Sequence, residues 1–434
     1  MPSMPLEVTR RVGRFSGQEW ALNAAIALQG PEWDQPRLGF MAAVCGHDSG
    51  ADFTALRHAI TKYNDISREM MKAARRRELR ARWMLEQGHE MTARESFFTA
   101  AALYGMAQWP IYANTELQLE LNAKKIGCYG EFIKLAGRRI ERVELPFEGQ
   151  TVPAYLHFPP GHDRSPVPCV VFTNGMDAYK EISAAMDGDR WLSRGFAMLA
   201  LDGPGTGESL CREIPYDPDT YGQLGPVAFD YLDRRPDIDS ARIVLSGLSM
   251  GSLWATTLAA AEPRYAAVAV AMTCFEPGEF SIFQTASPTF KLRFMYMTQT
   301  TTEDELDKLM FRMDPVGYAP AIRMPVCVVA GEDDELSELS STFKFLDAVP
   351  EPKTLMLYEG ELHALHASMA SRLGPEPLTM VADWLLDRVR GKPLDSTYME
   401  VDGSGMVHSW PWGEHRAYEY GITENLKRRI FAEQ

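Results

Sequence analysis

A serine lies between two glycines in the string Gly247-Leu248-Ser249-Met250-Gly251. The string follows the apolar run RIVLS and precedes the helix-like run GSLWATTLAAA. A serine on a strand-to-helix turn needs small neighbours because the turn is strained, and the helix N-terminus favours negative charge that develops on a substrate oxygen. The strand before and the helix after make this setting far more specific than a GxSxG string alone. The sequence therefore predicts Ser249 as a nucleophile.

A serine hydroxyl needs a base that takes its proton, and the base needs a third group that orients it. Two histidines follow Ser249 in the part of the chain with strand and helix patterns, His363 and His366. His363 lies closer to the end of the apolar run KTLMLY, in a loop that contains glycine. Open α/β sheets bind ligands at the carboxyl ends of their strands. His363 is therefore the predicted base.

Three adjacent carboxylates follow the apolar run PVCVVA, in the string Gly331-Glu332-Asp333-Asp334. The order serine, acid, histidine is the one that the α/β-hydrolase fold requires. A glycine followed by two residues and an aspartate is the common spacing for the acid, and it selects Asp334. Asp333 stays open as the alternative.

Two backbone amides are predicted to stabilise the oxyanion. One belongs to Met250, directly after the nucleophile, and the other to Met176, in the loop Asn174-Gly175-Met176 after the run PCVVFT. The Met176 prediction rests on loop position alone, because a backbone amide leaves no side-chain pattern.

Other candidate sites are interpreted as structural or absent. The string DGPGTGES at 202–209 resembles a dinucleotide-binding loop, but it lacks the spacing of the third glycine, so it is interpreted as a structural loop beside the site. The histidines form no HExxH pattern and the cysteines form no CxxC pairs. The sequence predicts neither a cofactor nor a metal.

These residues need a scaffold, and six short apolar runs supply it. Most are separated by helix-length segments, as in a parallel sheet covered by helices on both faces. With the nucleophile turn, this predicts an α/β class protein with the α/β-hydrolase fold. The runs are 168–173, 196–201, 242–246, 266–271, 325–330 and 353–358.

Changes in pattern divide the chain into five predicted parts. Residues 1–137 form a helical N-terminal domain, and residues 394–434 form a C-terminal tail with four aromatic residues, Trp410, Trp412, Tyr418 and Tyr420. The core lies between them in two halves, with a cap insertion in the middle. These three parts are 138–275, 276–319 and 320–393.

Five details of local structure are also predicted. Thr92 and Glu95 have the spacing of a capping box, which predicts a helix start at Thr92. The basic run Lys72 to Arg82 is expected to spread its charges around a solvated helix face. Phe97, Ala101 and Tyr104 have helical spacing and predict a packing face. A further helix is predicted within the cap at residues 302–313, and a β-hairpin around Glu148-Gly149-Gln150.

Composition excludes several functional classes. The chain has 434 residues and a formal net charge of −15, which argues against a nucleic-acid partner. No apolar segment suits a secretion signal or a membrane span. The six cysteines are scattered and indicate reduced core residues, so a cytoplasmic protein without membrane association is expected.

The strings NGMDAYKE at 174–181, DGPGTGES at 202–209, GLSMG at 247–251 and GEDDE at 331–335 follow a helical N-terminal region. Together they resemble the α/β-hydrolase family that includes 2,6-dihydroxypseudooxynicotine hydrolase, the fungal heptaketide pigment hydrolase and the fermentation–respiration switch proteins. The resemblance covers roughly residues 50 to 390.

The resemblance implies hydrolysis of a C–C bond beside a ketone, with Ser249, Asp334 and His363 as the triad. It also implies a small-molecule pocket under an N-terminal helical lid, and a homodimer. Where the family has Gly-Gly, this chain has Asn174-Gly175, and the aromatic tail is not a family feature. An esterase, thioesterase or lactonase would use the same triad. A non-catalytic interaction protein on this fold is the third hypothesis.

Overall fold

Ten strands form a single sheet in the order β1-β2-β4-β3-β5-β6-β7-β8-β9-β10. The computed structural model describes residues 19–414, except 279, 280, 285 and 351. The strands are β1 (Ile140–Phe147), β2 (Gln150–His157), β3 (Val167–Thr173), β4 (Ala197–Leu201), β5 (Ile238–Leu248), β6 (Val268–Ala271), β7 (Val326–Gly331), β8 (Lys353–Tyr358), β9 (Thr397–Val401) and β10 (Val407–Pro411).

The central part of the sheet is parallel and the two ends are antiparallel hairpins. Strands β4, β3, β5, β6, β7, β8 and β9 pair in parallel, whereas β1 pairs antiparallel with β2, and β9 with β10. Every residue of β4, β6, β7 and β8 is buried, as expected for strands with both faces covered. All six predicted apolar runs form strands here, and the predicted hairpin turns at Glu148 and Gly149.

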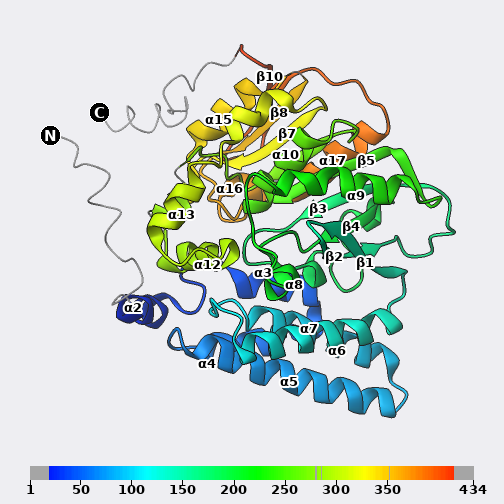
Figure 1. Cartoon of the computed structure of the whole chain (residues 1–434), viewed down its shortest axis with the longest axis vertical. Helices are drawn as coiled ribbons and strands as arrows, with labels where there is room; N and C mark the ends of the chain where they lie inside the picture. Colours follow the sequence, from blue (N-terminus) through cyan, green and yellow to red (C-terminus); the bar gives the residue numbers. More distant parts are fainter. Residues whose placement is uncertain (1–18, 279–280, 285, 351, 415–434) are drawn as a thin grey trace.

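Helices cover both faces of this sheet (Figure 1). One face packs against α9 (Leu224–Asp233), α10 (Met250–Ala261) and α15 (Leu339–Ala348), which contribute side chains such as Phe229, Leu258 and Phe345 to one apolar cluster. The opposite face packs against α17 (Pro377–Val389) through Val381 and Leu385. The predicted α/β architecture is confirmed.

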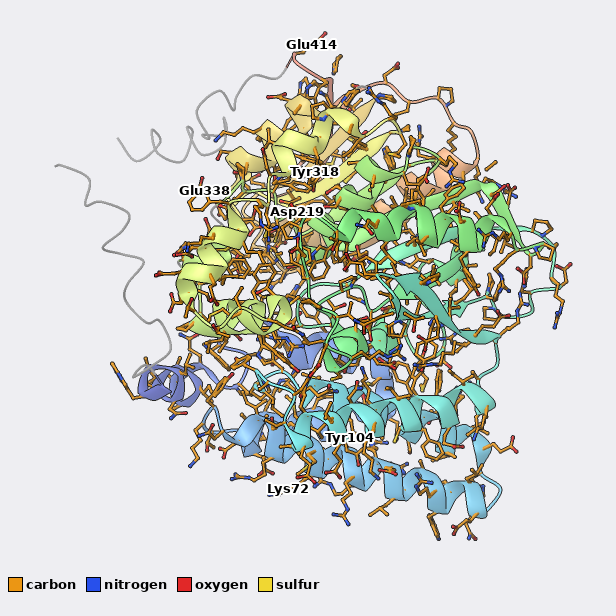
Figure 2. The ribbon with its side chains drawn as sticks, in the orientation of Figure 1. Lys72, Tyr104, Asp219, Tyr318, Glu338 and Glu414 are labelled. Atoms are coloured by element: carbon orange, nitrogen blue, oxygen red, sulfur yellow. The ribbon has the colours of Figure 1, made fainter. Side chains whose placement is uncertain are left out.

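The N-terminal helices form a separate layer on one side of the α/β part, drawn in blue to cyan in Figure 1. Phe97, Ala101 and Tyr104 are buried in the apolar core of this layer, as their helical spacing predicts. Figure 2 shows Lys72 at the edge of the layer, where its side chain is exposed. The helices are α2 (Glu19–Gln29), α3 (Arg37–Cys45), α4 (Gly50–Ala59), α5 (Asp65–Glu86), α6 (Glu90–Met106) and α7 (Glu116–Leu135).

Two predictions about these helices need correction. Helix α6 begins at Glu90, so Thr92 lies inside it; the chain leaves α5 through Gly88 at φ 77°, and packing of α5 against α6 fixes the start earlier. Arg77 in the basic run is buried, because it donates to Asp52 at 2.8 Å and to Asp48 at 2.6 Å.

No helix within the described residues is long and apolar enough to span a bilayer.

Among the described residues between β6 and β7, four short α-helices lie in the segment predicted as a cap insertion. They are α11 (Ser281–Gln284), α12 (Pro288–Thr298), α13 (Glu303–Met310) and α14 (Pro315–Tyr318). Helix α13 is the one predicted at 302–313, and Thr302 and Glu305 form its capping box. Helix α12 lies beside α3 of the N-terminal layer (Figure 1).

The described part of the C-terminal tail extends the sheet. Strand β9 pairs with β8 and then turns back into β10. The Trp410 ring stacks on Tyr398 at 5.7 Å between centroids, and the Lys353 ammonium lies 5.1 Å from the Trp412 ring. Tyr418 and Tyr420 lie outside the described residues.

Candidate active site

Ser249 occupies the sharp turn between β5 and α10. Its backbone has φ 57° and ψ −128°, a region that non-glycine residues rarely adopt and that marks stored strain. The flanking glycines are required by contact: a Cβ on Gly247 would lie 2.0 Å from the Gly251 carbonyl oxygen, and one on Gly251 would lie 2.2 Å from that of Thr173. The predicted strand–turn–helix setting is therefore present.

The structure brings Ser249, His363 and Asp334 into one hydrogen-bonded row. Ser249 Oγ lies 3.0 Å from His363 Nε2, and His363 Nδ1 lies 2.9 and 3.0 Å from the two carboxylate oxygens of Asp334. With its proton on Nδ1, the imidazole donates to Asp334 and accepts from the serine hydroxyl. This is the geometry that deprotonation of a serine needs.

Electrostatics favour proton uptake by His363. Burial lowers the pKa of this imidazole, but the negative charge of Asp334 and its hydrogen bond more than offset that effect, with smaller contributions from Glu335 and Asp177. The net result is a pKa above the usual value for histidine. In this ring, which is 2% exposed, it is therefore the Asp334 carboxylate, and not burial, that favours the imidazolium.

The open alternatives are separated by position. Asp334 holds its own orientation by accepting the amides of Leu336 and Ser337 at 2.9 and 3.0 Å. The Asp333 amide donates to the Glu361 carbonyl, and in the described part of the chain its carboxylate makes no hydrogen bond with His363. His366 is exposed and its Nδ1 lies 2.8 Å from the Ala364 carbonyl oxygen.

Two carboxylates that the sequence analysis did not single out hold the His363 loop. Glu361 is fully buried and accepts the amides of Ala367 and Ser368 at 2.8 and 3.0 Å, and the Ser368 hydroxyl at 2.9 Å. Glu335 accepts the backbone amide of His363 at 2.9 Å. Glu335 belongs to the string GEDDE. The spacing from Gly331 identifies only Asp334, so the string contains no signal for Glu335.

The loop Asn174-Gly175-Met176 lies against the nucleophile. A Cβ on Gly175 would lie 3.3 Å from Ser249 Cβ, so the glycine permits the close approach. The Asn174 side chain donates to Ser183 Oγ at 2.7 Å and fixes the loop. Met176 and Met250 are buried. This placement is compatible with the two predicted oxyanion amides, whose roles stay predictions.

A cavity of about 440 Å³ opens onto Ser249 and His363. Its walls are mostly apolar, and besides the sheet ends they include helix α3 with Phe40 and Met41, helix α12 with Phe290, and Trp191 in the segment between β3 and β4. The volume is that of a small-molecule site. Nothing in the sequence pattern of α3 indicated that it reaches the site.

The strings 174–181 and 202–209 meet in a buried ion cluster beside this cavity. Lys180 donates to Glu181, Asp202 and Glu208 at 2.9, 3.0 and 2.8 Å. Asp202 also accepts the amides of Lys180 and Glu208, both at 2.7 Å. A Cβ on Gly207 would lie 2.2 Å from the Asp202 carboxylate. The glycine-rich string 202–209 thus has a packing explanation, in line with its interpretation as a structural loop.

Within the residues described, no group of three or more His, Cys, Asp and Glu side chains is arranged to hold a metal ion.

Comparison with known proteins places the chain among hydrolases. Residues 70–303 match the family described as Esterase FrsA-like. The chain is 29% identical over 334 residues to 2,6-dihydropseudooxynicotine hydrolase of Paenarthrobacter nicotinovorans, a match that covers 75% of this chain and 86% of that protein. It is 28% identical to the α/β hydrolase xenA of Xenoacremonium sinensis, over 47% of this chain and 50% of that protein. The chain therefore matches about half the length of this fungal relative.

Two solved structures are similar over most of the chain. The crystal structure of 2,6-dihydroxy-pseudo-oxynicotine hydrolase has a TM-score of 0.67 and 26% identity, and covers 81% of this chain and 96% of its own. AbyA5 has a TM-score of 0.59 and 21% identity, with coverage of 79% and 94%. The α/β-hydrolase fold predicted from the sequence is confirmed.

Proposed function

The chain belongs to the FrsA-like esterase family of α/β-hydrolases, and from this premise we propose that it is a serine hydrolase acting on a C–C bond beside a ketone. Ser249 is the nucleophile, His363 the general base and acid, and Asp334 the group that orients the imidazole. The row of hydrogen bonds from Ser249 through His363 to Asp334, at the wall of a cavity lined mostly by apolar side chains, carries this proposal.

The proposed reaction is balanced by these groups and one water molecule. Ser249 Oγ attacks the ketone carbon while His363 takes its proton, and the amides of Met250 and Met176 stabilise the tetrahedral oxyanion. The C–C bond then breaks, its electron pair leaves as an enolate or phenolate-like carbanion, and His363 protonates that carbanion. Water, deprotonated by His363, then attacks the acyl carbon, and the acid leaves as the bond to Ser249 Oγ breaks and His363 returns the proton to that oxygen. The products are a carboxylic acid and the protonated leaving fragment.

The cavity supports an aromatic or polyketide-like substrate. Its lining is dominated by apolar side chains, among them Phe40, Trp191 and Phe290. A flat or aromatic ligand can bury its faces against such walls. In this proposal the N-terminal helices serve as a lid, because α3 contributes part of the wall.

Hydrolysis of an ester, thioester or lactone is the second candidate, favoured by the esterase family that residues 70–303 match. It needs the same Ser249, His363 and oxyanion amides and differs only in the leaving group. A comparison of β-diketones with p-nitrophenyl esters of equal size separates the two reactions. Cleavage of the diketones supports the leading proposal, whereas fast ester turnover without diketone cleavage rejects it in favour of an esterase.

A fluorophosphonate probe tests the serine mechanism itself. We expect covalent labelling of the wild-type protein at Ser249, loss of labelling in Ser249→Ala, and full labelling in Ser193→Ala, whose exposed serine is the matched control. Absence of labelling at Ser249 in the wild type would contradict the proposal and favour a non-catalytic interaction protein on this fold.

The triad also predicts non-additive losses. His363→Ala and Ser249→Ala should each reduce kcat about as much as the double variant, because the residues act as a unit. Single losses that add would argue against a shared step. The predicted homodimer is tested separately by sedimentation velocity.

A further inference from the structure

Three side chains beside the cavity carry buried N–H groups without acceptors. Trp109 Nε1, Arg37 Nη2, and Arg293 Nε and Nη1 have no hydrogen-bond partner within the described residues. The three side chains form one cluster, since the Arg37 and Arg293 guanidinium carbons lie 4.2 and 5.6 Å from the centre of the Trp109 ring. A buried donor without an acceptor is destabilising, so an excess of donors in one place indicates an acceptor-rich group from outside the chain.

The two arginines differ in how their charge is balanced. Arg37 pairs with Asp34 at 2.5 Å and with Asp177 at 2.7 Å. Arg293 is 6% exposed and has no carboxylate within ion-pair distance among the residues described, and burial lowers its pKa. Lys291, on the same helix and equally buried, does have such partners in Glu303 and Asp307. Among the described residues, Arg293 is thus a buried cation without a paired carboxylate, which a folded chain seldom keeps without use.

The cluster lies next to the substrate cavity. Phe290 lines that cavity, and Arg293 follows it by one helical turn on α12. Arg37 and Trp109 line a second cavity of about 100 Å³. Both cavities share part of their walls, including Phe40 and Asp177, and so adjoin one another. A ligand that extends from Ser249 toward the cluster would pass between these side chains.

We propose that Arg293, Trp109 and Arg37 form a subsite for a carboxylate of the substrate, at the end opposite to the carbonyl that Ser249 attacks. A carboxylate supplies the acceptors that the free N–H groups need and the negative charge that Arg293 lacks. The assignment of substrate orientation rests on the proposed function, whereas the anion subsite itself does not. The substrate class is then an acyl or β-diketone compound with a carboxylate-bearing arm.

Kinetics with paired esters test the subsite. The mono-p-nitrophenyl esters of dicarboxylic acids with six to ten carbons are compared with their methyl-capped diesters. We expect the wild type to prefer the free carboxylate by about 10- to 100-fold in kcat/KM at one best chain length, because a charged hydrogen bond is lost in the capped ester. In Arg293→Gln the preference should disappear, because kcat/KM for the free carboxylate falls more than kcat/KM for the capped ester.

Three further variants keep the test falsifiable if Arg293→Gln folds poorly. Arg293→Lys should retain part of the preference, and Trp109→Phe, which removes the indole N–H and leaves a smaller ring, should reduce it about threefold to tenfold. Arg312→Gln removes a half-exposed arginine paired with Asp217 and should leave the preference unchanged. Equal kcat/KM for both ester series in the wild type, or an unchanged preference in Arg293→Gln, would overturn the proposal.

Ligand binding without turnover separates the subsite from the reaction. In Ser249→Ala, suberate should raise the melting temperature, and uncharged 1,8-octanediol should not; adding Arg293→Gln should abolish the shift. A suberate shift in a protein that fluorophosphonate does not label would uphold the subsite and reject the serine mechanism. Labelling at Ser249 with equal shifts from both compounds would do the reverse.

Discussion

Replacing Lys180 by methionine should destabilise the protein strongly, because its ammonium lies at the centre of the buried ion cluster. Four cations and four carboxylates make up the cluster, and Lys180 donates to three of these carboxylates within 3.0 Å. Without Lys180 the cluster keeps one uncompensated negative charge in the interior. The members are Lys125, Arg142, Lys180, Arg212, Glu144, Glu181, Asp202 and Glu208.

The expected loss is about 3–5 kcal/mol in the free energy of unfolding at pH 8, the range for removing one partner from a buried pair. Most of this loss comes from Asp202, because Lys180 is its only ion-pair partner among the described residues. Glu181 and Glu208, the other two acceptors of Lys180, still pair with other cations in the variant. The free energy of unfolding of a protein domain is about 5–15 kcal/mol, so such a loss is a large fraction of the total stability. Urea unfolding followed by circular dichroism measures it.

The loss should depend on pH with a defined sign. In the wild type, burial raises the pKa of Asp202, but the charges of Lys180 and Lys125 lower it by more, so the net shift is downward. The stabilisation that ionised Asp202 contributes is therefore lost only when the pH falls into the acid range. In Lys180→Met burial dominates and the pKa of Asp202 rises above its unfolded value of about 4. The deficit should therefore shrink between pH 8 and pH 5.

Two controls complete the experiment. Lys72→Met removes an exposed lysine paired with Glu69 and should change stability by less than about 1 kcal/mol. Adding Asp202→Asn to Lys180→Met should recover part of the loss, since the uncompensated charge is gone. A loss below about 1 kcal/mol for Lys180→Met, or an equal deficit at pH 8 and pH 5, would refute the reasoning.

Three further outcomes follow from the site. Gly251→Ala should lower kcat by about 100-fold or more, because its Cβ would meet a carbonyl oxygen at 2.2 Å and displace the nucleophile turn; Gly127→Ala, with open space around it, is the control, and equal activity of both variants would contradict the argument. The acid limb of kcat/KM should lie above pH 6.5, because the pKa of His363 is raised, and Asp334→Asn should move it to lower pH; a limb that stays in place excludes this histidine as the titrating base. Glu361→Gln should lower kcat with little change in KM, because the His363 loop loses its charged acceptor; an altered KM with constant kcat would instead indicate a role in binding.

The sequence predicted those features that depend on residues close together along the chain. Strands β3 to β8 can be recognised in the sequence as short apolar runs, because a strand covered on both faces must be apolar throughout. The hypothesis for Ser249 came from a turn that needs glycine on either side, and the hypothesis for His363 from its place after a strand end in the required order. Asp334 could be chosen over Asp333 only by spacing, and its hydrogen bonds to the imidazole now support that choice.

Features that depend on distant contacts were out of reach. The charges of Lys180 and Asp202 look like ordinary loop charges, and only the fold shows that they bury one another. Arg37 carries no motif, yet α3 brings it to Asp177, 140 residues away along the chain. The start of α6 was misplaced because packing against α5 outweighed the capping box at Thr92.

The hairpin of β9 and β10 has a consequence for solubility. All six residues of β8 are buried, and β9 occupies the pairing edge of that strand. Strand β10, at the outer edge, carries exposed side chains, including His408. A shortened chain ending at residue 393 would present β8 as an apolar strand with free pairing groups, a template for aggregation. The last strands thus protect the sheet from associating with its own copies.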